Sequence, residues 1–217
     1  MGCVVVGTIN ICANEDHEPV DVDIKRNLTA GEIALAKLMF KDAIDYSKVK
    51  IVRGGLKGMP DRTDNAMTPV GEIHLPTKEY DDVKDYSKST SSADKVWFIH
   101  EMTHVWQYHL GFNTAAEGLV VAAEGGYVTR KGEDRPIAYL FDLYGKDKIK
   151  SFKEFNFEQQ GDLVSFYYDA VYLQNSRIKL HPKNVKQLPL LKNILKDFLN
   201  NPKDKNLLPV RDHSNYK

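Results

Sequence analysis

"FIHEMTHVWQYHLG", residues Phe98–Gly111, carries a His-Glu-x-x-His motif in an apolar run that no proline interrupts. On a helix, positions i and i+4 share a face, so His100 and His104 can direct two imidazole nitrogens at one metal ion. Glu101 lies about 100° further round such a helix and is close enough to act on a water without being a ligand. The motif therefore predicts a buried helix with a zinc (Zn2+) site and Glu101 as catalytic base, because zinc acidifies water and polarises carbonyl groups.

Size and charge narrow the class of protein. The chain has 217 residues, of which 42% are hydrophobic and 28% charged, enough for one hydrophobic core. Its 30 basic and 30 acidic residues cancel, which argues against nucleic acid or an anionic membrane as the main partner. Cys3 and Cys12 cannot form a disulfide framework or complete a zinc finger, and we interpret them as unpaired thiols.

Targeting signals are weak. No stretch approaches the ~20 apolar residues that a membrane span needs, so we expect no stable membrane anchor. The N-terminus has neither the basic region nor the cleavage site of a signal peptide. If the protein is secreted, we expect a route without a cleaved signal.

Periodicity predicts a single α+β domain with a small mixed or antiparallel sheet and a mostly helical C-terminal half. We expect an N-terminal extension over residues 1–27, a catalytic core over 28–200, and a polar, flexible tail over 201–217. Thr29 and Glu32 match a capping box before the first helix.

Strand and loop signals surround the motif. "KVKIVRGGL" (48–56) and "AMTPVGEIHLP" (66–76) read as strands, and Pro69 marks the second as an edge. Residues 81–94 read as a surface loop before the motif helix. After it, "NFEQQGDLVSFYYDAVYLQ" (156–174) and "LPLLKNILKDFL" (188–199) read as amphipathic helices.

The third metal ligand has two main candidates. Glu124 follows His104 by twenty residues, a spacing similar to that of thermolysin-like gluzincins, but Gly125 and Gly126 weaken a helix there. Glu158 and Asp162 reproduce the Glu-x-x-x-Asp pattern of those enzymes, in which the Asp orients a metal-binding histidine. We favour Glu158 and keep Glu124 as an alternative. His109 is a lesser candidate, because it would point away from the metal face.

Three segments together, "DRTDNAMTPVGEIHLP" (61–76), "FIHEMTHVWQYHLG" and "FNFEQQGDLVSFYYD" (155–169), resemble the zincin-like metallopeptidase domains of bacterial Rhs- and VgrG-associated effectors of type VI secretion. The resemblance spans roughly residues 29–175. It implies a zinc hydrolase with His100, His104 and Glu158 as ligands and Glu101 as base, acting as a toxin in the periplasm of a target bacterium. It also implies that residues 65–76 form the edge strand along which an extended substrate lies.

The substrate could be a peptide, a protein or the peptide stems of peptidoglycan, and the resemblance suggests a secretion-system delivery partner and a cognate immunity protein. Two rival hypotheses are a non-catalytic module braced by zinc and a housekeeping cytoplasmic peptidase. An intact Glu101 argues against the first. An oxyanion donor is also needed, and the candidates are Tyr139, Tyr167, Tyr168, His74 and His109.

Overall fold

Residues 3–6, 9–12, 24–55 and 67–211 are described in a computed structural model of the chain. β1 (Cys3–Val6) and β2 (Ile9–Cys12) pair as an antiparallel hairpin. No side chain before residue 24 is described, so the predicted unpaired state of Cys3 and Cys12 lies outside the described residues.

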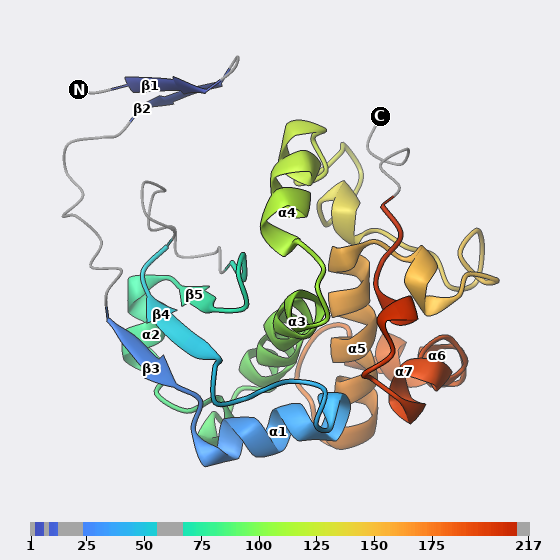
Figure 1. The fold of residues 1–217 in the computed structure, drawn as a ribbon. Helices are drawn as coiled ribbons and strands as arrows, with labels where there is room; N and C mark the ends of the chain where they lie inside the picture. Colours follow the sequence, from blue (N-terminus) through green and yellow to red (C-terminus); the bar gives the residue numbers. More distant parts are fainter. Residues whose placement is uncertain (1–2, 7–8, 13–23, 56–66, 212–217) are drawn as a thin grey trace.

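The main sheet is small and mixed, as predicted. Its strands are β3 (Lys25–Asn27), β4 (Lys50–Arg53) and β5 (Ile73–Leu75), in the order β3-β4-β5. β3 and β4 are antiparallel, whereas β4 and β5 are parallel. The chain is α+β, and helices make up most of its regular secondary structure (Figure 1).

The predicted strand over residues 66–76 is shorter than expected. Only Ile73–Leu75 forms a strand, and Met67 folds back to make one antiparallel bridge with His74. Pro69 has no N–H for a ladder, and Gly71 has a φ of 76°, which turns the chain. The segment is therefore a strand with a return loop, and residues 65 and 66 lie outside the described part.

α1 (Ala30–Phe40) begins as the sequence predicts. Thr29 accepts a hydrogen bond from the Glu32 backbone N–H, and the Glu32 carboxylate accepts one from the Thr29 backbone N–H. The same carboxylate pairs with Arg26 at 2.8 Å, which links the first helix to β3. This capping box positions α1 under the sheet edge (Figure 1).

Residues 81–94 are not the simple surface loop that the sequence indicates. They include the end of α2 (Thr77–Asp82), the 3₁₀ turn η1 (Tyr86–Lys88) and the start of α3 (Ser92–His109). Tyr86 is fully buried and stacks on Phe98 with ring centroids 5.2 Å apart. This aromatic contact pulls a polar segment onto the core.

α3 and α5 (Phe157–Tyr172) pack side by side at the centre of the molecule (Figure 1). Ser91 caps α3, and Asn156 caps α5 within a capping box. α3 buries Ile99, Met102, Val105 and Trp106, and α5 buries Leu163 and Val164. Because α3 carries the His-Glu-x-x-His motif, its packing on α5 decides which residues meet that motif.

The remaining elements surround this pair. They are α4 (Thr114–Ala123), η2 (Ile137–Tyr139), η3 (Phe152–Glu154), α6 (His181–Ile194), α7 (Lys196–Asn200) and η4 (Lys205–Leu207). None of the helices in the described part of the chain has both the length and the apolar character that a membrane crossing requires.

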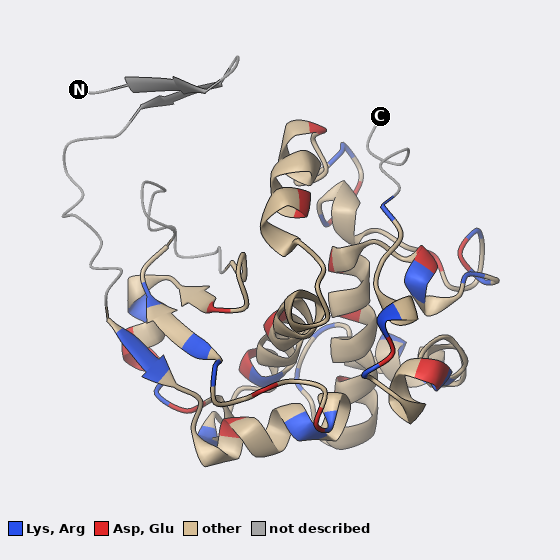
Figure 2. Ribbon diagram, viewed as in Figure 1, with Lys and Arg blue, Asp and Glu red and all other residues tan. Residues whose placement is uncertain are grey.

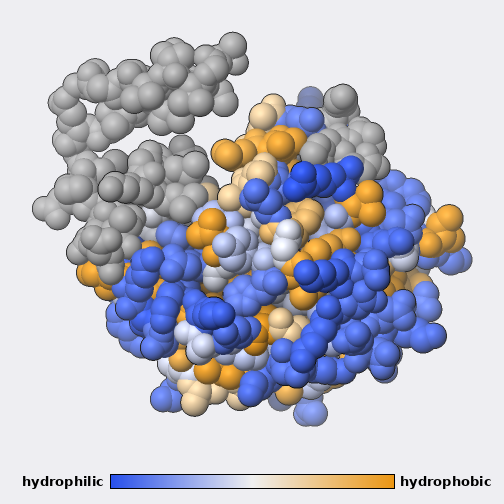
Figure 3. Space-filling model, in the orientation of Figure 1, coloured by the Kyte–Doolittle hydropathy of each residue, from blue (hydrophilic) through white to orange (hydrophobic). Residues whose placement is uncertain are grey.

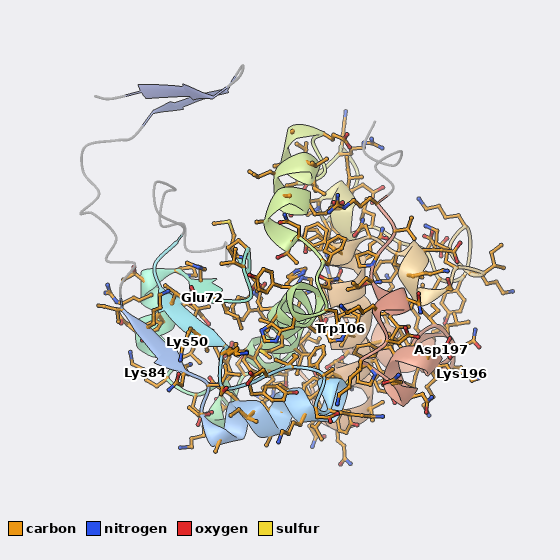
Figure 4. The ribbon with its side chains drawn as sticks, viewed as in Figure 1. Lys50, Glu72, Lys84, Trp106, Lys196 and Asp197 are labelled. Atoms are coloured by element: carbon orange, nitrogen blue, oxygen red, sulfur yellow. The ribbon has the colours of Figure 1, made fainter. Side chains whose placement is uncertain are left out.

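The predicted flexible tail over 201–217 packs against the core as far as residue 211. The Trp106 indole N–H donates to the Pro202 carbonyl oxygen at 2.6 Å, and the Val210 backbone N–H donates to the Lys153 carbonyl oxygen at 2.8 Å. Figure 4 shows Trp106 between α3 and the C-terminal segments. Buried Leu207 adds apolar contact that the polar composition concealed, and residues 212–217 lie outside the described part.

Candidate metal centre

Three predicted ligand residues converge between α3 and α5. The Nε2 atoms of His100 and His104 lie 3.2 Å apart, and Oε2 of Glu158 lies 3.2 Å from the first and 3.1 Å from the second. All three side chains are nearly buried. This group of two histidines and one glutamate could hold a metal ion.

The spacing of His100 Nε2, His104 Nε2 and Glu158 Oε2 fits a small cation in tetrahedral coordination. Zinc bound at about 2.0–2.1 Å in a tetrahedral site has ligand atoms about 3.3–3.4 Å apart. The observed triangle is within a few tenths of an ångström of that spacing. Two imidazole nitrogens and one carboxylate are also a known catalytic zinc set that leaves a fourth position for water or substrate.

The tautomers of both histidines favour a cation at the same point. His100 Nδ1 lies 3.2 Å from Asp162 Oδ1, and His104 Nδ1 lies 2.9 Å from Gln107 Oε1. Each Nδ1 therefore carries the proton, because each faces an acceptor. In the neutral rings both Nε2 lone pairs then point at the Glu158 oxygen, and three converging acceptors need a positive charge among them.

The orientation of Gln107 is fixed by a buried amide network. Its Nε2 donates to the Phe157 carbonyl oxygen at 3.1 Å and to Gln160 Oε1 at 3.0 Å. Gln160 in turn donates to the carbonyl oxygens of Phe152 and Leu207 at 3.0 and 2.9 Å. The amide oxygen of Gln107 is thus left to face His104, so the C-terminal segment helps to set the tautomer of a candidate ligand.

The electrostatics of the group show the same preference for positive charge. Burial alone would lower the pKa of His100, but hydrogen bonds with Asp162 and Glu158 raise it to about 10. Burial alone would raise the pKa of Glu158, but the charge of His104 and hydrogen bonds from both histidines hold it well below its usual range. The site stabilises a cation beside an ionised carboxylate.

The irregular segment 125–139 supports Glu158 and Asp162, the two acidic residues of α5 that face the histidines. The Tyr127 hydroxyl donates to Glu158 Oε1 at 2.7 Å, while the other oxygen of Glu158 faces the histidines. Arg135 pairs with Asp162 Oδ2 at 2.6 Å and lies over the Tyr139 ring. Arg135 therefore contacts Asp162, and Asp162 contacts His100, so the positive guanidinium lies behind the carboxylate that faces the imidazole.

Glu101 lies beside the ligands without joining them. It is buried, and its charge helps to raise the pKa of both His100 and His104, which places it within electrostatic reach of the two rings. The Thr68 hydroxyl donates to its Oε2 at 2.7 Å. The Thr114 hydroxyl, at the start of α4, lies within hydrogen-bond distance of the carbonyl oxygens of Pro69 (2.8 Å) and Thr68 (3.1 Å), and its one proton holds this turn in place.

Gly161 makes room for a ligand. A Cβ atom at this position of α5 would lie 2.6 Å from Cε1 of His100 and under 3.0 Å from both ring nitrogens. A glycine in mid-helix destabilises by about 0.5–1 kcal/mol relative to alanine. Here its absence of a side chain lets the His100 ring lie against the α5 backbone, between Glu158 and Asp162.

The other sequence candidates do not join the group of His100, His104 and Glu158. Glu124 ends α4 as its C-cap and is not in the three-residue group. His109 ends α3, where its Nδ1 accepts a 3.4 Å hydrogen bond from the Asp45 N–H. Of the oxyanion candidates, Tyr139 has its ring centroid 6.0 Å from that of His100, whereas Tyr168 is buried against Tyr172.

Sequence reasoning missed five residues of this centre: Thr68, Gln107, Tyr127, Arg135 and Gly161. Two of them carried a usable signal. Gln107 stands three residues after His104, so a helix turns it toward the same face, and Gly161 interrupts an otherwise strong helical pattern. Thr68, Tyr127 and Arg135 come from irregular segments, where no periodicity predicts which way a side chain points.

Comparison with known proteins gives one consistent relative. No family model matches the chain. The chain is 35% identical over 148 residues to the type VI secretion system spike protein VgrG2b of Pseudomonas aeruginosa, an alignment that covers 68% of this chain and 13% of that protein. This chain thus corresponds to a small part of the spike protein.

A solved structure from the same protein is also similar to this chain. The effector domain of P. aeruginosa VgrG2b superposes with a TM-score of 0.54 and 29% identity, over 81% of this chain and 84% of that domain. The chain is homologous to that effector domain. The homology links it to the effectors of type VI secretion.

Proposed function

We propose that the chain is a zinc-dependent amide hydrolase of the zincin-like metallopeptidase type, delivered as an antibacterial effector by type VI secretion. The observation that carries this proposal is the meeting of His100 Nε2, His104 Nε2 and Glu158 Oε2 within 3.2 Å of one another, with Glu101 buried beside them. A purely structural zinc site has four protein ligands. This group has three.

Zinc held by these three residues would supply Lewis acidity for a carbonyl group and acidity for a water molecule. The protein side chains do the rest. Asp162 and Gln107 hold the protons of the histidines on Nδ1, so that both Nε2 atoms remain free to bind the metal. The Thr68 hydroxyl donates to the carboxylate of Glu101, which in this proposal accepts a proton and returns it to the leaving amine.

The effector role is supported by the relative. The curated relative is a type VI secretion system spike protein, and the solved one is its effector domain. For this chain we infer delivery by such a system, action in the periplasm of a target bacterium, and a cognate immunity protein in the producer.

Metal analysis and one conservative variant test the activity. The purified protein should contain about one zinc per chain. Glu101→Gln removes the base but keeps the shape of the side chain, so we expect it to retain zinc and to lose hydrolysis by about 10²–10⁴-fold, the usual contribution of general acid–base catalysis. Full activity in Glu101→Gln would rule out the proposed mechanism.

The site of action is tested in cells. Wild-type protein fused to a cleavable export signal should arrest growth, and the same protein kept in the cytoplasm should not. The exported Glu101→Gln variant is the matched control for overproduction. Equal toxicity in both compartments, or toxicity that survives Glu101→Gln, would contradict a periplasmic hydrolase.

A further inference from the structure

The amphipathic character of α4 is reversed. Its buried positions are Thr114, Glu117 and Val121, so two of the three inward side chains are polar. Glu117, the one charged residue in the sequence of this helix, points inward and pairs with Arg211 at 3.4 Å. Leu119, by contrast, is 64% exposed. A surface helix ordinarily does the opposite.

The exposed apolar side chains of α4 belong to a larger patch. Of the thirteen exposed large apolar residues in the described chain, six come from the return loop before β5, the end of α3, α4 and the segment that follows α4. We call these six the apolar rim: Val70, Tyr108, Leu119, Val120, Tyr127 and Val128. Figure 3 shows hydrophobic side chains gathered over α4 at the top of the view.

The apolar rim is continuous with the catalytic machinery on both sides. On one side, the position of a Gly118 Cβ lies 3.7 Å from the Tyr127 hydroxyl, which bonds to Glu158. On the other, Thr114 donates to the Pro69 carbonyl oxygen at 2.8 Å, next to Val70. A chain seated on the rim is therefore within a few residues of the metal ligands, at about 3.3–3.6 Å per extended residue.

Charge decides what kind of molecule this surface accepts. Residues 112–128 contain two glutamates and no lysine or arginine, and α4 is almost entirely free of basic colour in Figure 2. This stretch therefore offers no cation to pair with the carboxylates of peptidoglycan stems or with the anionic head groups of lipids. Large apolar side chains need no such cation and lose contact with water.

The size of this surface favours a short peptide segment over a folded protein as its occupant. A helix of ten residues is about 15 Å long, and a stable protein interface uses roughly 20–30 residues on each side. The outward face of α4 offers far fewer. It suits a short extended segment better than a second copy of this chain.

We propose that the apolar rim is the docking surface for the substrate, and that the substrate is a polypeptide with large apolar side chains close to the bond that is cut. This inference rests on the proposed hydrolase function and assigns its substrate class. Leu119 and Val128 are specificity residues, because they are 64% and 58% exposed and contribute little to the core.

A fluorogenic decapeptide library tests the inference. The zinc-loaded wild-type protein should cleave preferentially next to Leu, Ile, Val or Phe, and the double variant Leu119→Ser/Val128→Ser should lose that preference. On the best peptide, we expect KM to rise about ten-fold for the removal of two apolar contacts, with kcat within about two-fold because the reacting groups are untouched.

A second double variant supplies the matched control. Ile149→Ser/Val185→Ser removes two other exposed apolar side chains, 93% and 46% exposed, from outside the rim. It should leave KM and sequence preference unchanged. Zinc content and circular dichroism of both double variants establish that they fold.

The outcomes separate this inference from the proposed function. Glu101→Gln that cleaves like wild type defeats the hydrolase itself. Cleavage that depends on Glu101 but shows no apolar preference, or release of stems from purified sacculi without cleavage of any peptide, overturns only the docking proposal. Unchanged peptide kinetics in Leu119→Ser/Val128→Ser would also overturn the docking proposal. Loss of binding to phosphatidylglycerol vesicles, or loss of self-association, in the same variant would then identify a lipid surface or a second copy of this chain as the occupant of the rim.

Discussion

Two regions build the candidate metal centre, and they differ in kind. The helices α3 and α5 supply the three candidate ligand atoms and the candidate base. The irregular segment 125–139 supplies no ligand, yet Tyr127 contacts Glu158 and Arg135 contacts Asp162. The helices set the positions of the candidate ligands. The segment stabilises the orientation and the negative charge of Glu158 and Asp162.

The comparison predicts an order of effects on metal affinity. Changes on the helices should act directly on the ligand triangle. Changes in segment 125–139 should act through Asp162 or Glu158 and therefore more weakly. Four substitutions test this order, each read as the dissociation constant for zinc.

Glu158→Ala should have the largest effect. It removes one of three candidate ligands and leaves only two histidines for the metal. Zinc affinity should therefore fall by more than the roughly 10–100-fold that accompanies loss of a residue that hydrogen-bonds to a ligand. The thermal stabilisation by added zinc should fall with it, because only the folded chain holds the complete site. Glu124→Ala is the matched control, and a comparable loss there would make Glu124 the third ligand.

Gly161→Ala should come second, with roughly 10–100-fold weaker zinc binding. The added methyl group would sit 2.6 Å from the His100 ring and push it out of the ligand triangle. In Gly118→Ala the same change meets only the Tyr127 hydroxyl, at 3.7 Å. That variant should keep zinc affinity within about two-fold while gaining about 0.5–1 kcal/mol of helix stability. Equal zinc binding in the two variants would show that the His100 ring needs no such room.

These two helices are also where sequence reasoning succeeds. The i to i+4 spacing places His100 with His104 and Glu158 with Asp162, because helix geometry converts sequence distance into a shared face. The capping pattern at Thr29 is likewise local, and the structure confirms it. What a regular element determines within four residues can be read without the fold.

The rest depends on tertiary structure. Arg135 and Tyr127 belong to a segment with no repeat, so nothing local indicates that they meet α5. The return loop at Gly71 and the packed C-terminal segment around Pro202 have the same origin, since turns and long-range contacts decide them. The reversed face of α4 is visible only when burial is known.

Arg135→Gln should come third, with about 3–10-fold weaker zinc binding. This loss is smaller than the roughly 10–100-fold expected for a residue that itself hydrogen-bonds to a ligand, because Arg135 acts through Asp162. Asp162 would keep its hydrogen bond to His100 but lose its counter-charge. Lys131→Gln removes the same charge from an exposed position of the same segment and should change affinity by less than about two-fold. Arg135→Lys should restore only part of the loss, because lysine lacks the planar group that lies over Tyr139.

Tyr127→Phe should have the smallest effect, a loss of about 2–5-fold in zinc affinity. A hydrogen bond to a charged group is worth about 1.5–3 kcal/mol, but Tyr127 is 38% exposed, so water can replace its hydroxyl at Glu158 Oε1. Tyr144→Phe serves as the control, because Tyr144 is exposed and its hydroxyl donates to the Lys186 carbonyl oxygen rather than to a candidate ligand. If Tyr127→Phe weakens zinc binding more than Gly161→Ala does, the order is reversed. Segment 125–139 would then be a primary determinant of the site, and the helices would provide only a scaffold for ligands that the segment holds in place.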